Sequence, residues 1–170
     1  MLFFHGFALR DEEHFFSEYL EKGSYVVSGF SYGAIQAFEY ALSSQQRIDT
    51  LQLFSPAFFQ NSSTKFKRLQ MMGYTKSAET YISRFTENCF LPYAPREVSY
   101  SKHSAEELEV LLNHVWSDQE LETLRLRGTK IEVYLGSEDK ISDAISAKDF
   151  FTPYAEVTLI KGANHFLQGE

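Results

Sequence analysis

The sequence predicts an α/β fold in which a mainly parallel sheet is flanked by helices. Short apolar and β-branched runs alternate along the chain with segments of helical spacing, as where residues 24–27 are followed by residues 34–42. This alternation is typical of a parallel sheet, because the crossover between two parallel strands is usually a helix. The 170 residues show no internal repeat and no linker rich in proline, glycine or serine, so we expect one domain over residues 1–170.

The N-terminal elements follow from local patterns. An apolar run at residues 2–4 predicts a strand that ends at His5-Gly6. After the acidic residues 11–13, apolar side chains recur at helical spacing until Gly23, which predicts a helix of about three turns. The next strand then begins directly after this glycine.

The rest of the chain adds further strands and helices. Alternation predicts strands at residues 50–54, 131–135 and 156–160, and helical spacing predicts a helix at residues 144–151. Residues 57–128 show no strand alternation of comparable strength, and Ser104-x-x-Glu107 resembles a capping box at the start of a helix. We interpret residues 57–128 as a helical lid insertion into the single domain.

Charge and composition exclude several classes of function. A formal net charge of -7 argues against nonspecific binding to nucleic acids or anionic membranes, which attract clustered cations. The single cysteine, Cys89, has no partner for an internal disulfide, a zinc knuckle or a dithiol pair. The N-terminus lacks the pattern of a secretory signal, and no apolar run approaches the length of about 20 residues that spans a membrane. We therefore expect a cytoplasmic protein, and nothing in the sequence requires a metal or an organic cofactor.

The candidate nucleophile is Ser31, the central residue of Gly29-Phe30-Ser31-Tyr32-Gly33. A GxSxG turn between a strand and a helix holds its serine in a strained corner, and the two glycines relieve the crowding and expose the hydroxyl. An ordinary turn can carry the same pattern. Here, however, a strand is predicted before the pentapeptide and a helix after it, as the chemistry requires.

A serine hydroxyl needs a histidine that removes its proton and an acid that orients the histidine. In α/β-hydrolases these two residues follow the serine, in the loops after two late strands. Residues 136–139 and His165 occupy these places. We therefore predict a shortened α/β-hydrolase with Ser31, Asp139 and His165 as the catalytic triad, and Glu138 is the alternative acid.

Acyl transfer also needs two backbone N–H groups that stabilise the oxyanion. The residue after the nucleophile, Tyr32, is expected to supply one of them. The other is expected from Phe7, because Gly6 at the end of the first strand lets the chain turn the next amide inward.

Six short motifs along the chain form a recognisable set. They are Phe3-Phe4-x-Gly6-Phe7, Val27-Ser28-Gly29-Phe30-Ser31-x-Gly33-Ala34, Leu53-Phe54-Ser55-Pro56, Phe66-Lys67-Arg68-Leu69-Gln70, Lys130-Ile131-Glu132-Val133 and Asn164-His165. With these motifs the chain resembles the short pimeloyl-acyl-carrier-protein methyl ester esterases of the BioV type. The resemblance implies hydrolysis of the methyl ester of a pimeloyl acyl carrier protein, with release of methanol, in biotin synthesis. Residues 7–30 leave room for only one helix, so a strand and a helix that most α/β-hydrolases have before the nucleophile are expected to be missing.

A basic stretch within the predicted lid is compatible with this substrate. Residues 61–76 contain Lys65, Lys67, Arg68 and Lys76 and no acidic residue. A carrier protein is acidic, so Lys65, Lys67 and Arg68 are candidate carrier-binding residues. The alternative is a solvated helix face whose alkyl stems cover the core.

Two other functions stay open at this point. The same triad would serve a thioesterase or an esterase of broad specificity for small esters, and the sequence pattern does not separate these from a methyl esterase. A noncatalytic binding module with a hydrolase-like fold is the third reading, and the complete set of Ser31, Asp139 and His165 argues against it.

Overall fold

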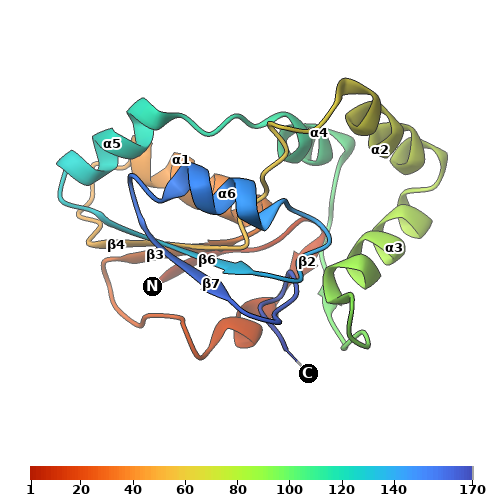
Figure 1. The fold of residues 1–170 in the computed structure, drawn as a ribbon, viewed down its shortest axis with the longest axis horizontal. Helices are drawn as coiled ribbons and strands as arrows, with labels where there is room; N and C mark the ends of the chain where they lie inside the picture. Colours follow the sequence, from red (N-terminus) through yellow and green to blue (C-terminus); the bar gives the residue numbers. More distant parts are fainter. Residues whose placement is uncertain (170) are drawn as a thin grey trace.

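Five parallel strands form the central sheet, in the order β1-β3-β4-β6-β7, in the computed structural model, which describes residues 1–169 (Figure 1). The strands are β1 (Leu2–Phe4), β3 (Val26–Phe30), β4 (Thr50–Phe54), β6 (Lys130–Gly136) and β7 (Glu156–Ile160). The predicted α/β class is confirmed. Because the strands are parallel, the loops after β3, β6 and β7 meet at one edge of the sheet.

Helices cover one face of this sheet. Contacts with the strands come from α1 (Tyr32–Ser43), α5 (Asp118–Leu126) and α6 (Ala144–Phe151), while α4 (Ala105–Asn113) packs on α1. Alternate strand residues such as Leu51, Leu53 and Val133 are fully buried in the core beneath them. The capping box is confirmed, because Ser104 and Glu107 bond each other's backbone N–H groups.

The other face is covered differently from the prediction. Instead of a helix of three turns, the chain forms a short 3-10 helix, η1 (Glu12–Phe16), and then turns. The reason is a buried glutamine on β4: Gln52 accepts a hydrogen bond from the Glu21 N–H and donates one to the Tyr19 carbonyl. These two backbone groups bond the sheet, so they are not engaged in helical pairing.

An aromatic cluster fills the space between η1 and the sheet. Phe16 stacks on Phe54 with ring centroids 4.8 Å apart and lies 4.9 Å from Phe30, which in turn stacks on Phe166. All four rings are at most 1% exposed. The apolar spacing around Phe16 that predicted a helix therefore reflects burial against this cluster.

Residues 57–128 contribute both to the sheet's cover and to a separate helical pair. The pair consists of α2 (Thr64–Lys76) and α3 (Ala78–Phe90), which lie to the right in Figure 1, while α5 covers the sheet. A short strand that the sequence did not predict, β5 (Ser99–Tyr100), pairs antiparallel with β2 (Leu9–Arg10). Among residues 1–169, no helix is both long enough and apolar enough to span a membrane.

Candidate active site

The turn between β3 and α1 holds Ser31 in a strained conformation. Its φ of 54° and ψ of -111° lie outside the regions that non-glycine residues favour. A Cβ on Gly29 would lie 2.1 Å from the Gly33 carbonyl oxygen. A Cβ on Gly33 would lie 2.1 Å from the Phe4 carbonyl oxygen. Both glycines are therefore required by backbone packing, and the turn has the geometry of a nucleophile elbow.

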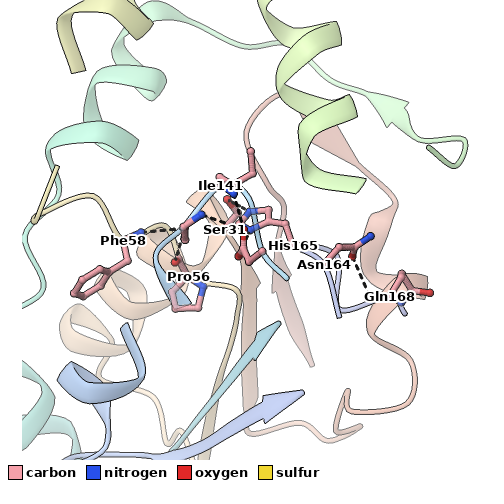
Figure 2. Close-up of polar contacts among 9 residues, drawn as sticks. Ser31, Pro56, Phe58, Ile141, Asn164, His165 and Gln168 are labelled. Carbon is pink, nitrogen blue, oxygen red and sulfur yellow. Dashed lines mark hydrogen bonds and ion pairs between the residues drawn. The ribbon is translucent and has the colours of Figure 1, made fainter. Parts of the chain in front are cut away.

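A relay of hydrogen bonds joins the three predicted triad residues (Figure 2). The Ser31 Oγ lies 3.0 Å from His165 Nε2, and His165 Nδ1 lies 2.6 Å from Asp139 Oδ2. A carboxylate can only accept, so Nδ1 carries the proton and Nε2 of the neutral ring accepts from the serine hydroxyl. This is the arrangement in which the imidazole can remove the Ser31 proton.

The acid loop after β6 selects between the two candidate carboxylates. The second oxygen of Asp139, Oδ1, accepts from the N–H groups of Ile141 at 2.7 Å and Ser142 at 3.0 Å (Figure 2). Glu138 instead faces solvent, where its Oε2 lies 3.3 Å from Lys140 Nζ. The structure thus brings Asp139, and not Glu138, to His165.

Two positions near the elbow were predicted as oxyanion donors. Tyr32 is the first residue of α1, and Phe7 lies in the loop after β1. Within residues 1–169, neither backbone N–H donates a hydrogen bond to another protein group. Both amides are therefore available to an oxygen bound at Ser31.

The triad is closed off from solvent. Ser31 is 2% exposed, and the side chains of Asp139 and His165 are 0% exposed. The ring of Phe7, in the loop after β1, packs edge-on against Phe85 of α3, with centroids 6.0 Å apart. With the triad this deeply buried, surrounding residues have to move before a substrate reaches Ser31.

Three further residues support the triad. The Ser142 hydroxyl donates to the Pro56 carbonyl and accepts from the Phe58 N–H, which ties the acid loop to the turn after β4 (Figure 2). Asn164 donates to the carbonyl of Phe90 and so fastens the histidine loop to the end of α3. A Cβ on the third residue, Gly136, would lie 2.3 Å from the Asn164 carbonyl oxygen. Sequence patterns did not predict these supporting contacts, because the partners are distant in sequence.

One group of side chains in residues 1–169 has the composition of a metal site. His5, Glu12 and Glu13 each place one ligand atom within 4.8 Å of the others. The short contact in the group is a hydrogen bond, 2.9 Å between His5 Nδ1 and Glu12 Oε2. The other oxygen of Glu12 accepts from the Gly6 N–H, so hydrogen bonding already accounts for this carboxylate.

The single cysteine does not compete with Ser31 as a nucleophile. Cys89 lies on α3 and is 1% exposed. Complete burial, and secondly the charge of Asp139, raise the pKa of its thiol well above the ordinary value. The reactive thiolate form is therefore suppressed.

The predicted carrier-binding residues lie together on α2. Lys65 and Arg68 are exposed and Lys67 is half-buried. No ion pair with an acidic residue of the described chain, 1–169, engages any of the three. Farther along α2, Lys76 lines a cavity of about 430 Å³ together with Arg84 of α3.

Comparison with solved structures identifies the fold. The chain is similar to a carboxylesterase of the thaumarchaeon Nitrososphaera gargenis, with a TM-score of 0.56 and 16% identity over 83% of this chain and 57% of that one. It is also similar to naproxen esterase (carboxylesterase NP) of Bacillus subtilis, with a TM-score of 0.56 and 20% identity over 84% and 53% of the two chains. MenH from S. aureus matches with a TM-score of 0.59 and 14% identity over 96% and 85%.

These likenesses show the α/β-hydrolase fold for this chain. The chain spans little more than half the length of the two carboxylesterases. No family model matches the sequence, and no curated protein is similar to it.

Proposed function

We propose that this protein is a serine esterase that uses Ser31 as its nucleophile. The observation that carries the proposal is the relay from Ser31 through His165 to Asp139, with contacts of 3.0 and 2.6 Å, at a serine with positive φ. Two solved structures with this fold are named carboxylesterases, which supports ester hydrolysis as the reaction class.

The reaction follows from the geometry of the relay. His165 Nε2 takes the proton as Ser31 Oγ attacks the ester carbonyl carbon, and Asp139 stabilises the imidazolium that forms. The N–H groups of Phe7 and Tyr32 stabilise the oxyanion. The intermediate collapses, the alcohol leaves with the proton from His165, and water activated by the same nitrogen hydrolyses the acyl-enzyme.

The proposed substrate is the methyl ester of a pimeloyl chain on an acyl carrier protein, as in biotin synthesis. Two features support this choice: the motif resemblance to the BioV-type esterases and the cations of α2. Lys65, Lys67 and Arg68 offer an acidic carrier protein a positive surface on a chain of net charge -7. The alcohol released is then methanol.

The proposal is tested by hydrolysis of pimeloyl-carrier methyl ester with wild-type protein and the variant Ser31→Ala. We expect the variant to lose at least about 10⁴-fold in kcat, because the covalent route is removed, and to keep the circular dichroism spectrum of the wild type. The matched control is Ser43→Ala, at the exposed end of α1, which should retain full activity. Turnover of Ser31→Ala near the wild-type rate contradicts the assignment.

The same substrate separates the methyl esterase from a thioesterase, because it carries both bonds. We expect the enzyme to release methanol and to leave the thioester to the carrier intact. Mass spectrometry of the carrier measures both. Release of the free carrier as the main product would instead assign a thioesterase.

A further inference from the structure

Glu12 is a buried carboxylate that the proposed mechanism does not use. It is 1% exposed, on η1 directly beneath the loop that follows β1. Its Oε1 accepts a hydrogen bond of 2.6 Å from the Gly6 N–H, and its Oε2 lies 2.9 Å from His5 Nδ1. A buried polar group is costly unless such partners stabilise it, so the fold places this carboxyl group specifically against Gly6.

The bond to Gly6 restrains the peptide group next to the one that carries the Phe7 amide. The Gly6 carbonyl, on the other side of the residue, accepts a hydrogen bond of 3.1 Å from the Leu9 N–H. In a planar trans peptide the carbonyl and the N–H point in opposite directions, so the Phe7 N–H points away from Leu9. Glycine has wide backbone freedom, and these two bonds hold the peptide planes on both sides of Gly6.

The restrained loop touches the nucleophile elbow on both sides of Ser31. A Cβ on Gly6 would lie 2.7 Å from Cδ1 of Phe30, and a Cβ on Gly33 would lie 2.4 Å from the His5 carbonyl oxygen. The direction of the Phe7 N–H therefore decides whether the elbow has a second donor for the oxyanion.

We propose that Glu12 is a positioning residue, whose buried carboxylate holds the Gly6 amide and thereby directs the Phe7 N–H toward the oxyanion. The inference rests on the proposed function, because it needs an oxyanion at Ser31. Without the carboxylate the Gly6 N–H loses its acceptor and the loop samples other orientations. The transition state then loses part of one donor, which lowers the rate by about 10- to 100-fold, less than the complete removal of an oxyanion donor.

A fluorophosphonate probe tests this without knowledge of the acyl substrate. Ser31 Oγ attacks phosphorus as His165 Nε2 takes its proton, fluoride leaves with its bonding electrons, and the phosphoryl oxygen occupies the place of the oxyanion. The measured quantity is the second-order rate constant of this labelling for Glu12→Ala, Glu12→Asp and Glu12→Gln, beside the thermal unfolding midpoint of each. The matched control is Glu13→Gln, because the Glu13 side chain is 41% exposed and lies 4.0 Å from His5 without bonding Gly6.

The expected pattern depends on the acceptor and not on the charge. Glu12→Ala and Glu12→Asp should label about 10- to 100-fold more slowly, because neither side chain reaches the Gly6 N–H. Glu12→Gln keeps an acceptor oxygen and should recover to within about threefold of the wild type, as should Glu13→Gln. If Glu12 had a purely structural role, the variants would unfold at a lower temperature, and the labelling rate of Glu12→Gln would not recover.

Two results overturn the inference. One is labelling of Glu12→Ala and Glu12→Asp within about twofold of the wild type, and the other is a Glu12→Gln variant as slow as Glu12→Ala. If Glu12→Ala does not fold, the labelling rates of Glu12→Asp and Glu12→Gln are compared instead, and equal rates overturn the inference. A folded wild type that the probe does not label overturns the proposed function as well, whereas a labelled wild type with unaffected Glu12 variants overturns this inference alone.

Discussion

Ser31 illustrates how single residues store strain for chemistry. Its positive φ is maintained because its N–H donates to the Phe54 carbonyl and its own carbonyl accepts from the N–H groups of Ala34 and Ala57. Backbone strain of this kind costs of order 1–3 kcal/mol and persists only where the surroundings over-determine it. Here three backbone hydrogen bonds, one from α1 and two from either side of the turn after β4, hold Ser31 in this conformation. As a result, the Ser31 hydroxyl lies within hydrogen-bond distance of His165.

A second residue, His114, should make stability depend on pH. Its Nε2 is buried and has no hydrogen-bond partner among residues 1–169, and its ring packs edge-on against Trp116 at 4.7 Å. Burial lowers the pKa of this imidazole from 6.5 to about 4. Between these values the unfolded chain binds a proton that the folded protein does not, so the free energy of unfolding falls as the pH decreases through this window.

The variant His114→Phe should reduce that pH dependence. The ring is partly exposed, so we expect a contribution of about 1–2 kcal/mol, which the variant abolishes because phenylalanine does not titrate. Urea denaturation followed by circular dichroism at pH 4 and pH 7 measures it. The exposed His14→Gln serves as the control, and equal pH slopes for His114→Phe and the wild type would contradict the prediction.

At the scale of elements, the helical pair of α2 and α3 has a fixed end and a loose end. The end of α3 is fastened to the histidine loop, where Asn164 donates to the Phe90 carbonyl and the Tyr93 hydroxyl donates to that of Gly162. In contrast, α2 has no fully buried residue, and its Leu69 and Met72 are 52% and 56% exposed. A helix with so little burial is the element that local opening displaces most easily.

The cations of α2 should act on the carrier and not on the chemistry. We expect Lys67→Gln with Arg68→Gln to raise KM for pimeloyl-carrier methyl ester about 10-fold at low salt, since each lost contact with an acidic partner is worth up to about 1 kcal/mol. Hydrolysis of a small p-nitrophenyl ester should not change. The matched control is Lys22→Gln with Lys148→Gln, two exposed cations outside α2. Equal losses on both substrates would contradict a role in carrier binding.

At the scale of the whole molecule, helices cover one face of the sheet and the segment with η1 covers the other (Figure 1). The aromatic cluster packs with η1 on that second face. The strand residues alternate between the two cores, with Leu53 on the helical side and Phe54 on the aromatic side. Phe30, which precedes the nucleophile, belongs to the aromatic cluster and contacts the His165 ring at 5.0 Å. The cluster therefore supports both the fold and the elbow.

Truncation within this cluster should destabilise the protein strongly. Phe16 is 0% exposed and stacks on Phe54, so we expect Phe16→Ala to lower the free energy of unfolding by about 3–5 kcal/mol through loss of burial and a cavity. Leu126→Ala, at a side chain 75% exposed, should cost less than about 0.5 kcal/mol. Urea denaturation measures both, and a loss below about 1 kcal/mol for Phe16→Ala would show that η1 is not an essential part of the core.

The sequence by itself determined the five strands, the helix after the elbow and the order of serine, acid and histidine. These depend on periodicity and on loop position, which are local properties of the chain. Only the tertiary structure decided that residues 12–16 form a short 3-10 helix, that Asp139 rather than Glu138 meets His165, and that Glu12 bonds Gly6. Each of these depends on partners from other elements, such as Gln52 or the histidine loop, and no local pattern encodes such contacts.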